Sequence, residues 1–199
     1  MQKNLTGKIV GTALFSALSF VVSLLEFPVF PAASFLKLDF SAVFVLLGGF
    51  MYGPVAGLIV CAVKELIRFI MGSSTGGVGE IANFIAITCL MIVPTVVYRF
   101  RKGLPVVIIT LIVGVLTMTA AATVCNRFIM FPLYMGESAA NAFASLWYYI
   151  VLFNLIKGAA VSVVVLLLYK RLSALFKKIN LQYSPENDTI EKENETDIS

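Results

Sequence analysis

Residues 104–126 read LPVVIITLIVGVLTMTAAATVCN, a stretch without a single charged side chain. An α-helix rises about 1.5 Å per residue, so a run of roughly 20 apolar residues spans the roughly 30 Å hydrocarbon core of a bilayer. A soluble helix of that length would carry a polar stripe every three to four positions. Because this stretch carries no such stripe, it predicts a helix that crosses a membrane.

The rest of the chain has the same character. Of its 199 residues, 59% are hydrophobic and 13% are charged, and the charges avoid the long apolar runs. These runs predict an all-α membrane protein with about six transmembrane helices. The predicted spans are residues 8–26, 40–52, 54–71, 77–98, 104–131 and 146–170.

The loop before the second span is the most unusual part of this arrangement. That span is short for a full crossing, and Gly53 and Pro54 separate it from the third span by a tight turn. One of its ends therefore lies below the bilayer surface, where irregular backbone must be buried in protein or line a cavity. The preceding loop is FPVFPAASFLKLDF, residues 27–40, in which two prolines block a helix.

The distribution of Lys and Arg predicts the orientation of the chain. The Lys and Arg residues of the short loops fall mainly on one side of a six-span arrangement, which is the cytoplasmic side of a multi-pass protein in the cell membrane, and leave only Lys37, Arg68 and Arg127 near the other face. Both termini should be cytoplasmic, and the long loop 27–39 should face outward together with loops 71–77 and 132–145. The cations on the cytoplasmic side are Lys3, Lys8, Arg99, Arg101, Lys102, Lys170, Arg171, Lys177 and Lys178.

Two domains are expected. Residues 1–178 are expected to form a six-helix transmembrane domain, which contains the candidate substrate-binding residues considered below. Residues 179–199 end in SPENDTIEKENETDIS, which has no aromatic residue and is rich in Glu, Asn and Asp. Such a composition predicts a disordered acidic cytoplasmic tail.

Several kinds of chemistry are not expected. The chain has no histidine, and its three cysteines lie within apolar segments, so neither a catalytic triad nor a metal site is predicted. The glycine-rich stretch GSSTGGVGE, residues 72–80, lacks the Gly-Lys-Ser/Thr ending of a nucleotide-binding loop. Cations at the ends of apolar runs indicate membrane orientation rather than nucleic-acid binding. No enzyme activity and no cofactor are predicted.

Polar residues inside apolar spans are the candidates for function, because a polar or ionised group in lipid is costly. Asn154 and Lys157 stand three apart on one helix face, as do Glu80 and Asn83, and Asn126 lies in the outer part of the fifth span. We expect these side chains to converge on one outward-facing pocket. The alternative for each asparagine is a hydrogen bond to a neighbouring helix.

The third span contains Lys64, Glu65 and Arg68. Glu65 and Arg68 are spaced to pair on one helix face, so we interpret this trio as structural rather than functional.

Five motifs together resemble the S components, the substrate-binding subunits, of energy-coupling factor (ECF) vitamin transporters, and specifically their riboflavin-specific type. The resemblance covers about residues 8–172. It is carried by FPVFPAASFLKLDF at 27–40, GPVAGL at 53–58, STGGVGEIANF at 74–84, CNRF with PLY at 125–134, and FNLIKG at 153–158.

The resemblance implies a subunit without ATPase activity that binds riboflavin with high affinity from outside. Its partners would be a transmembrane coupling protein and two ATPases, and ATP-driven tilting in the bilayer would carry the vitamin inward. Ala13 and Ala17 match the AxxxA pattern that packs on the coupling protein in this family. The matching pocket residues are Leu38, Gly79, Asn126, Asn154 and Lys157, with Glu80 and Asn83 as further candidates.

The chemistry of these residues agrees with a flavin. The isoalloxazine ring presents carbonyl acceptors and one imide N–H, which asparagine amides and a lysine complement. A cationic vitamin would require a carboxylate-rich pocket, which the sequence does not predict. Two alternatives stay open: an S component for another vitamin, and a stand-alone secondary transporter driven by an ion gradient.

Overall fold

The computed structural model describes the backbone of residues 2–73 and 75–182, and the side chains of residues 5–73 and 75–168. The chain forms two compact units, Met1–Val163 and Val164–Ser199. The first unit contains every element up to the middle of the last helix. The second unit, where it is described, is the continuation of that helix to Gln182.

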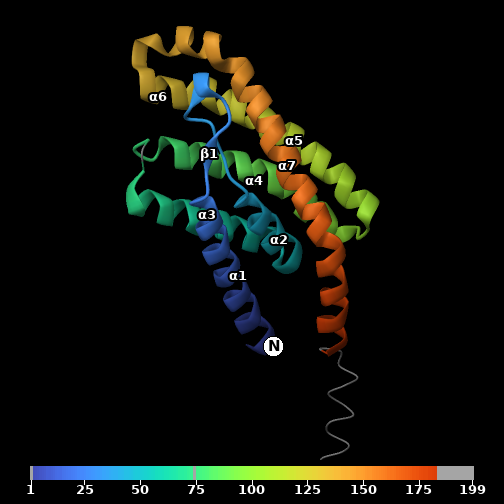
Figure 1. The fold of residues 1–199 in the computed structure, drawn as a ribbon. Helices are drawn as coiled ribbons and strands as arrows, with labels where there is room; N and C mark the ends of the chain where they lie inside the picture. Colours follow the sequence, from blue (N-terminus) through green and yellow to red (C-terminus); the bar gives the residue numbers. More distant parts are fainter. Residues whose placement is uncertain (1, 74, 183–199) are drawn as a thin grey trace, which may run out of the picture. The chain divides into compact units, whose positions relative to one another are not determined.

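Helices dominate the described chain, as Figure 1 shows, which confirms the expected all-α class. The exception is a two-stranded antiparallel ribbon, β1 (Phe27–Pro28) with β2 (Lys37–Leu38). The helical elements are α1 (Gln2–Ser23), η1 (Pro31–Ala33), α2 (Ala42–Tyr52), α3 (Pro54–Gly72), α4 (Val78–Phe100), α5 (Leu104–Cys125), the π-helical turn η2 (Asn126–Met130), α6 (Phe131–Met135), η3 (Gly136–Ser138) and α7 (Ala139–Gln182).

Three helical stretches in the described part of the chain are long and apolar enough to cross a membrane: Leu5–Ser23, Val78–Phe100 and Leu104–Leu168. The last of these includes two of the predicted spans, because α5, η2, α6, η3 and α7 follow one another without an extended loop. α2 has 11 residues and is short, as predicted. The count of six crossings stays a prediction.

The region 132–145, predicted to be a loop, is mostly helical. Pro132 stands in the first turn of α6, where its missing N–H breaks no helical hydrogen bond. Gly136 then turns the chain with a φ of +53°, and α7 begins at Ala139, ahead of the predicted start at 146. At its other end α7 continues past residue 178. Residues 183–199 of the predicted tail lie outside the described residues, so their disorder stays a prediction.

Small residues allow the helices of the first unit to approach closely. A Cβ built on Gly114 of α5 would lie 2.5 Å from the backbone oxygen of Leu90 in α4. In the same way, a Cβ on Gly57 of α3 would lie 3.0 Å from the Cα of Gly49 in α2. Small residues at such crossings are what membrane helices use to pack without a hydrophobic driving force.

The loop between α1 and α2 is ordered by an apolar cluster and by ion pairs. Its buried side chains Ala33, Leu36 and Leu38 pack in one cluster with residues of α6 and α7. In Figure 1 the loop rises from the end of α1 toward these helices. Glu26, just before β1, receives Arg68 of α3 at 2.7 Å and Lys37 of β2 at 2.7 Å. Arg68 therefore pairs with Glu26 rather than with the predicted Glu65.

Candidate functional site

The first unit contains an open cavity of about 670 Å³. This volume lies within the roughly 300–1,000 Å³ range of small-molecule sites in proteins. The walls come from the α1–α2 loop, α3, α4, the α5–η2–α6 segment and α7, so segments distant in sequence meet here. The polar lining residues are Glu26, Ser34, Lys37, Asp39, Glu65, Arg68, Thr75, Glu80, Asn83, Asn126, Tyr134, Asn154 and Lys157.

Asn126 and Asn154 line this cavity with part of each amide still available. Asn154 Nδ2 donates to the Ile150 carbonyl at 2.8 Å, and Asn126 Nδ2 donates to the Ala122 carbonyl at 2.8 Å. Each bond uses one of the two N–H groups of an amide and fixes its plane. The second N–H and the carbonyl oxygen of each amide have no partner among the described residues. They can pair with a ligand that presents both acceptors and donors.

Asn126 is the first residue of the π-helical turn η2, in which hydrogen bonds join residues five apart instead of four. Ala122, Asn126 and Met130 are each four apart, share one face of the helix and all line the cavity. Such turns inside α-helices occur frequently at functional sites.

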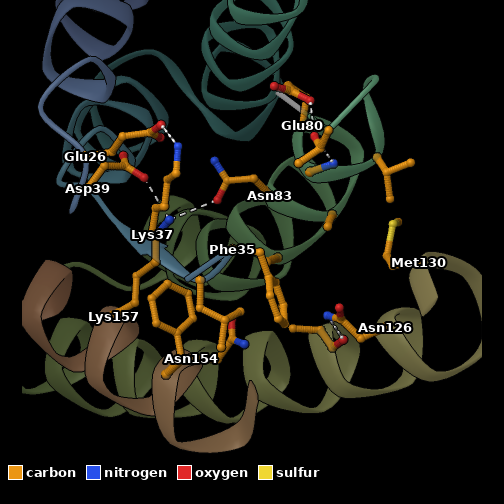
Figure 2. Close-up of a pocket in the computed structure, with 18 of the residues that line it drawn as sticks. Glu26, Phe35, Lys37, Asp39, Glu80, Asn83, Asn126, Met130, Asn154 and Lys157 are labelled. Carbon is orange, nitrogen blue, oxygen red and sulfur yellow. Dashed lines mark hydrogen bonds and ion pairs between the residues drawn. The ribbon is translucent and has the colours of Figure 1, made fainter. Parts of the chain in front are cut away.

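Lys157 is the deepest cation of the site and is 2% exposed. Its Nζ lies 2.8 Å from Asp39 Oδ2 and 3.0 Å from Asn83 Oδ1. Figure 2 shows Lys157 reaching from α7 toward both partners. A buried ammonium group is tolerated when a carboxylate and further hydrogen bonds replace its water shell. The partners of Lys157 supply both.

Asp39 itself stands in the loop before α2 and is 3% exposed. Burial raises the pKa of this carboxyl, but the ammonium groups of Lys157 and Lys64 outweigh that effect. The net pKa of Asp39 lies well below its ordinary value. It is therefore ionised throughout the neutral and mildly acidic range.

Glu80 and Gly79 belong to the turn that precedes and begins α4. Glu80 Oε2 accepts hydrogen bonds from Ser73 at 2.7 Å and from Thr75 at 3.2 Å, and Gly79 N–H donates to Thr75 Oγ1 at 2.9 Å. A Cβ on Gly79 would lie 2.7 Å from that same Oγ1. Both residues line the cavity, and Glu80 also braces the turn through its hydroxyl partners.

Leu38 is the one predicted pocket residue that stands behind the wall. Its side chain is 7% exposed and belongs to the apolar cluster of the loop, while its neighbours Lys37 and Asp39 line the cavity. The structure thus brings six of the seven predicted residues to one cavity: Gly79, Glu80, Asn83, Asn126, Asn154 and Lys157.

Aromatic rings and methionines form the apolar part of the lining. Phe35, Phe131 and Phe153 line the cavity, and the Phe35 and Phe131 rings contact each other edge to face at 6.1 Å between centroids. Met118 and Met130 add flexible apolar surface. These groups suit the faces of a flat conjugated ligand.

Sequence reasoning missed the contribution of Asp39, Glu65 and Arg68 to this lining. Their charges were visible, but the ion-pair partners of Asp39 and Arg68 lie on other elements, and Glu65 also accepts a hydrogen bond from Asn83 of α4. The prediction that the pocket is not rich in carboxylates is wrong. Four carboxylates line the cavity: Glu26, Asp39, Glu65 and Glu80. Each of these carboxylates is engaged by a cation or by hydroxyl groups.

The sequence profile of the family described as "ECF transporter, substrate-specific component" matches residues 7–169 of this chain. The chain belongs to this family. As an ECF substrate-specific component it is a multi-pass membrane protein that binds a transported substrate, and it is not an enzyme.

Individual members of the ECF family resemble the chain over most of their length. It is 34% identical to a Staphylococcus aureus (strain TCH60) protein named riboflavin transporter RibU, over 90% of this chain and 96% of that protein. It is 35% identical to the Bacillus subtilis (strain 168) riboflavin transporter FmnP, over 83% and 91% respectively. The solved S component of a bacterial ECF transporter superposes with a TM-score of 0.77 at 33% identity, covering 87% of this chain and 99% of that structure.

Ala13 and Ala17, the predicted contact with the rest of the ECF transporter, lie away from the cavity. Both side chains are exposed on α1, next to Leu14 (58% exposed) and Leu18 (39% exposed). All four of these side chains are small or aliphatic, which permits close approach of another helix.

Proposed function

We propose that this chain is the riboflavin-binding S component of an ECF-type vitamin uptake transporter. The observation that carries the proposal is the convergence of Asn126, Asn154 and Lys157 on one cavity of the first unit. Two relatives with more than 30% identity are named riboflavin transporters, which favours riboflavin over other vitamins.

The chemistry of the cavity supports a flavin. The ring system of riboflavin presents carbonyl oxygens and an imide N–H along one edge, and the free amide groups of Asn126 and Asn154 offer the complementary donors and acceptors. Phe35, Phe131 and Phe153 provide apolar walls for its faces. The hydroxylated side chain of the vitamin would lie toward Gly79 and the backbone around Leu38.

The charges of the cavity suit an uncharged ligand. Glu26 is matched by Arg68 and Lys37, and Asp39 is matched by Lys157. A ligand with a net charge would have to displace one of these partners or remain uncompensated in a low-dielectric site. Riboflavin carries no net charge at neutral pH and avoids this cost.

In the membrane we infer six transmembrane helices, with the loop between α1 and α2 outside and both termini in the cytoplasm. Arg99, Arg101 and Lys102, between α4 and α5, stand on the cytoplasmic side in this arrangement. The cavity then opens to the outside, from which a scarce vitamin is captured.

Transport requires partners in this proposal. A transmembrane coupling protein and two ATPases join the chain, contact it through Ala13 and Ala17, and tilt it in the bilayer to release riboflavin inside. The chain has no nucleotide-binding motif among its residues and relies on the ATPases for energy.

The proposal is tested by titrating the purified chain, in detergent or nanodiscs, with riboflavin and following the quenching of flavin fluorescence. We expect saturable one-to-one binding, and no binding of thiamine, biotin or pantothenate in competition. An absence of saturable quenching contradicts the assignment to riboflavin. In ATP-free liposomes the chain alone should bind flavin without sustained uptake, whereas a secondary transporter would accumulate it along an ion gradient.

A further inference from the structure

Five buried residues and the half-buried Asn83 form a closed ring of polar contacts beside the cavity. Lys157 donates to Asp39, and Asp39 accepts from the backbone N–H and the hydroxyl of Ser41. Lys64 donates to Ser41 Oγ at 3.1 Å and pairs with Glu65 at 2.5 Å. Asn83 completes the ring, which joins the α1–α2 loop to α3, α4 and α7.

Asn83 has both ends of its amide occupied within this ring. Its Nδ2 donates to Glu65 Oε1 at 2.6 Å, and its Oδ1 accepts from Lys157 Nζ at 3.0 Å. Its orientation is therefore set by two charged partners on different helices. One N–H of this amide has no partner among the described residues, but the two contacts to charged groups fix the amide plane, so we assign Asn83 a supporting role in the cavity wall.

Lys157 also keeps one donor free, and this donor belongs to a charged group. An ammonium group has three N–H donors, and the described residues accept two of them, through Asp39 and Asn83. The third donor is the one left for a ligand in the cavity that Lys157 lines. The direction of this third N–H is set by the two N–H groups that Asp39 and Asn83 hold.

We propose that Asp39 and Asn83 are positioning residues that hold the Lys157 ammonium group so that its third N–H meets a carbonyl oxygen of the flavin. This inference rests on the proposed function. Asp39 supplies the charge that keeps the ammonium group in place, and Asn83 supplies the second acceptor that fixes its rotation. Neither residue needs to touch the ligand.

Charge balance within the ring explains why a carboxylate stands at position 39. The ring contains two cations, Lys64 and Lys157, and two anions, Asp39 and Glu65. An amide at position 39 would leave two ammonium groups facing one carboxylate in a buried site. The Lys157 side chain would then move toward the remaining acceptors and away from its ligand-directed position.

A double-mutant cycle tests the proposal, because it separates an effect through Lys157 from a direct or general effect. The variants are Asp39→Asn, Asn83→Ala and Lys157→Met, alone and with Lys157→Met combined with each of the others. Riboflavin affinity is measured by fluorescence quenching on the full chain, and the absorption spectrum of bound flavin is recorded. Glu137→Gln and Asn141→Ala make the same kinds of change at exposed positions outside the cavity.

We expect Asp39→Asn and Asn83→Ala each to weaken riboflavin binding at least fivefold, and to change it by less than twofold when Lys157 is already Met. Their bound-flavin spectra should shift in the direction seen for Lys157→Met, while both controls retain wild-type affinity. Unchanged affinity in Asp39→Asn and Asn83→Ala, or losses that multiply in the double variants, would overturn the inference.

Three further outcomes are distinguishable. If Asp39→Asn does not yield folded protein, the Asn83→Ala and Lys157→Met cycle alone decides whether the loss of affinity depends on Lys157. If the wild-type chain shows no saturable riboflavin binding, the proposed function and this inference fail together. If the wild type binds riboflavin, and Asp39→Asn and Asn83→Ala bind it with wild-type affinity, the inference alone fails.

Discussion

Single side chains in this protein show how polar groups are accommodated inside apolar helices. Asn154 is 4% exposed in the middle of α7, and it pairs one N–H with a backbone carbonyl of its own helix, four residues earlier. This arrangement satisfies the amide only in part. A buried amide with free groups in a cavity costs free energy unless a ligand or water completes it.

Replacing Asn154 by alanine should therefore weaken riboflavin binding. We expect a loss of about 1 kcal/mol or more, close to a tenfold rise in the dissociation constant at about 1.4 kcal/mol, because ligand groups lose their partner. Fluorescence titration measures the effect. Asn141→Ala, at an exposed position of the same helix, should bind as the wild type does. Equal affinities of Asn154→Ala and wild type would remove this residue from the site.

Lys64 has a structural role at the same scale. It is 0% exposed and pairs with Glu65, whose second oxygen has no partner in the described part of the chain. Lys64→Met should lower the stability of the folded protein by about 3–5 kcal/mol, the usual effect of leaving one buried charge without its partner.

Thermal unfolding of the purified chain in detergent checks the Lys64 prediction. The double variant Lys64→Met with Glu65→Gln removes both charges, so it should recover much of the lost melting temperature. If the single variant melts like the wild type, Glu65 is not dependent on Lys64 for its charge compensation.

At the scale of elements, the close packing of α4 on α5 depends on the absence of a side chain at Gly114. The space there is filled by the backbone oxygen of Leu90, which cannot rotate away as a flexible side chain would. The position also lies one helical turn from Met118, which lines the cavity. Separation of these helices would therefore alter the cavity as well as the packing.

Gly114→Ala should destabilise the protein by about 1–3 kcal/mol, the range for overpacking at a tight contact. The matched control is Gly7→Ala in α1, where a Cβ meets nothing within 4 Å. That change should be neutral or slightly stabilising, since alanine is the better helix former. Melting temperatures in one detergent compare the two variants, and equal values would show that α4 and α5 separate freely at Gly114.

At the scale of the whole molecule, the cavity and the proposed assembly surface lie on different parts of the chain. The cavity is lined by the α1–α2 loop, α3, α4, α5 to α6, and α7. Ala13 and Ala17 face away from it on α1. A ligand and a protein partner can therefore engage the chain at the same time.

Ala13→Trp and Ala17→Trp should prevent co-purification with the coupling protein and the ATPases, because a large side chain stops close helix contact. Both variants should bind riboflavin with wild-type affinity. Ala120→Trp, at an exposed alanine of α5, is the control and should assemble normally. Recovery of an intact complex with Ala13→Trp would place the interface elsewhere.

The all-α class and the set of polar candidates were predictable from the sequence because hydropathy is a local property. A charge-free run such as 104–126 can be recognised without knowing what packs against it. The free-energy cost of burying the Lys157 ammonium group in an apolar helix can be recognised in the same way. The helical start at Ala139 was missed, because the predicted loop 132–145 contains a short helix and a tight turn at Gly136.

Hydropathy along the chain is enough to predict membrane helices and to identify the polar groups that need partners inside them. The identity of those partners depends on the fold: Asp39 contacts Lys157, 118 positions away, and Arg68 contacts Glu26 rather than Glu65, three positions away. The physical reason is that an ion pair depends on the distance between side chains after packing. Within one helix, a side chain can reach only partners three or four positions away. The packing of the loop and the helices determines which of these partners, or of those on other elements, it contacts.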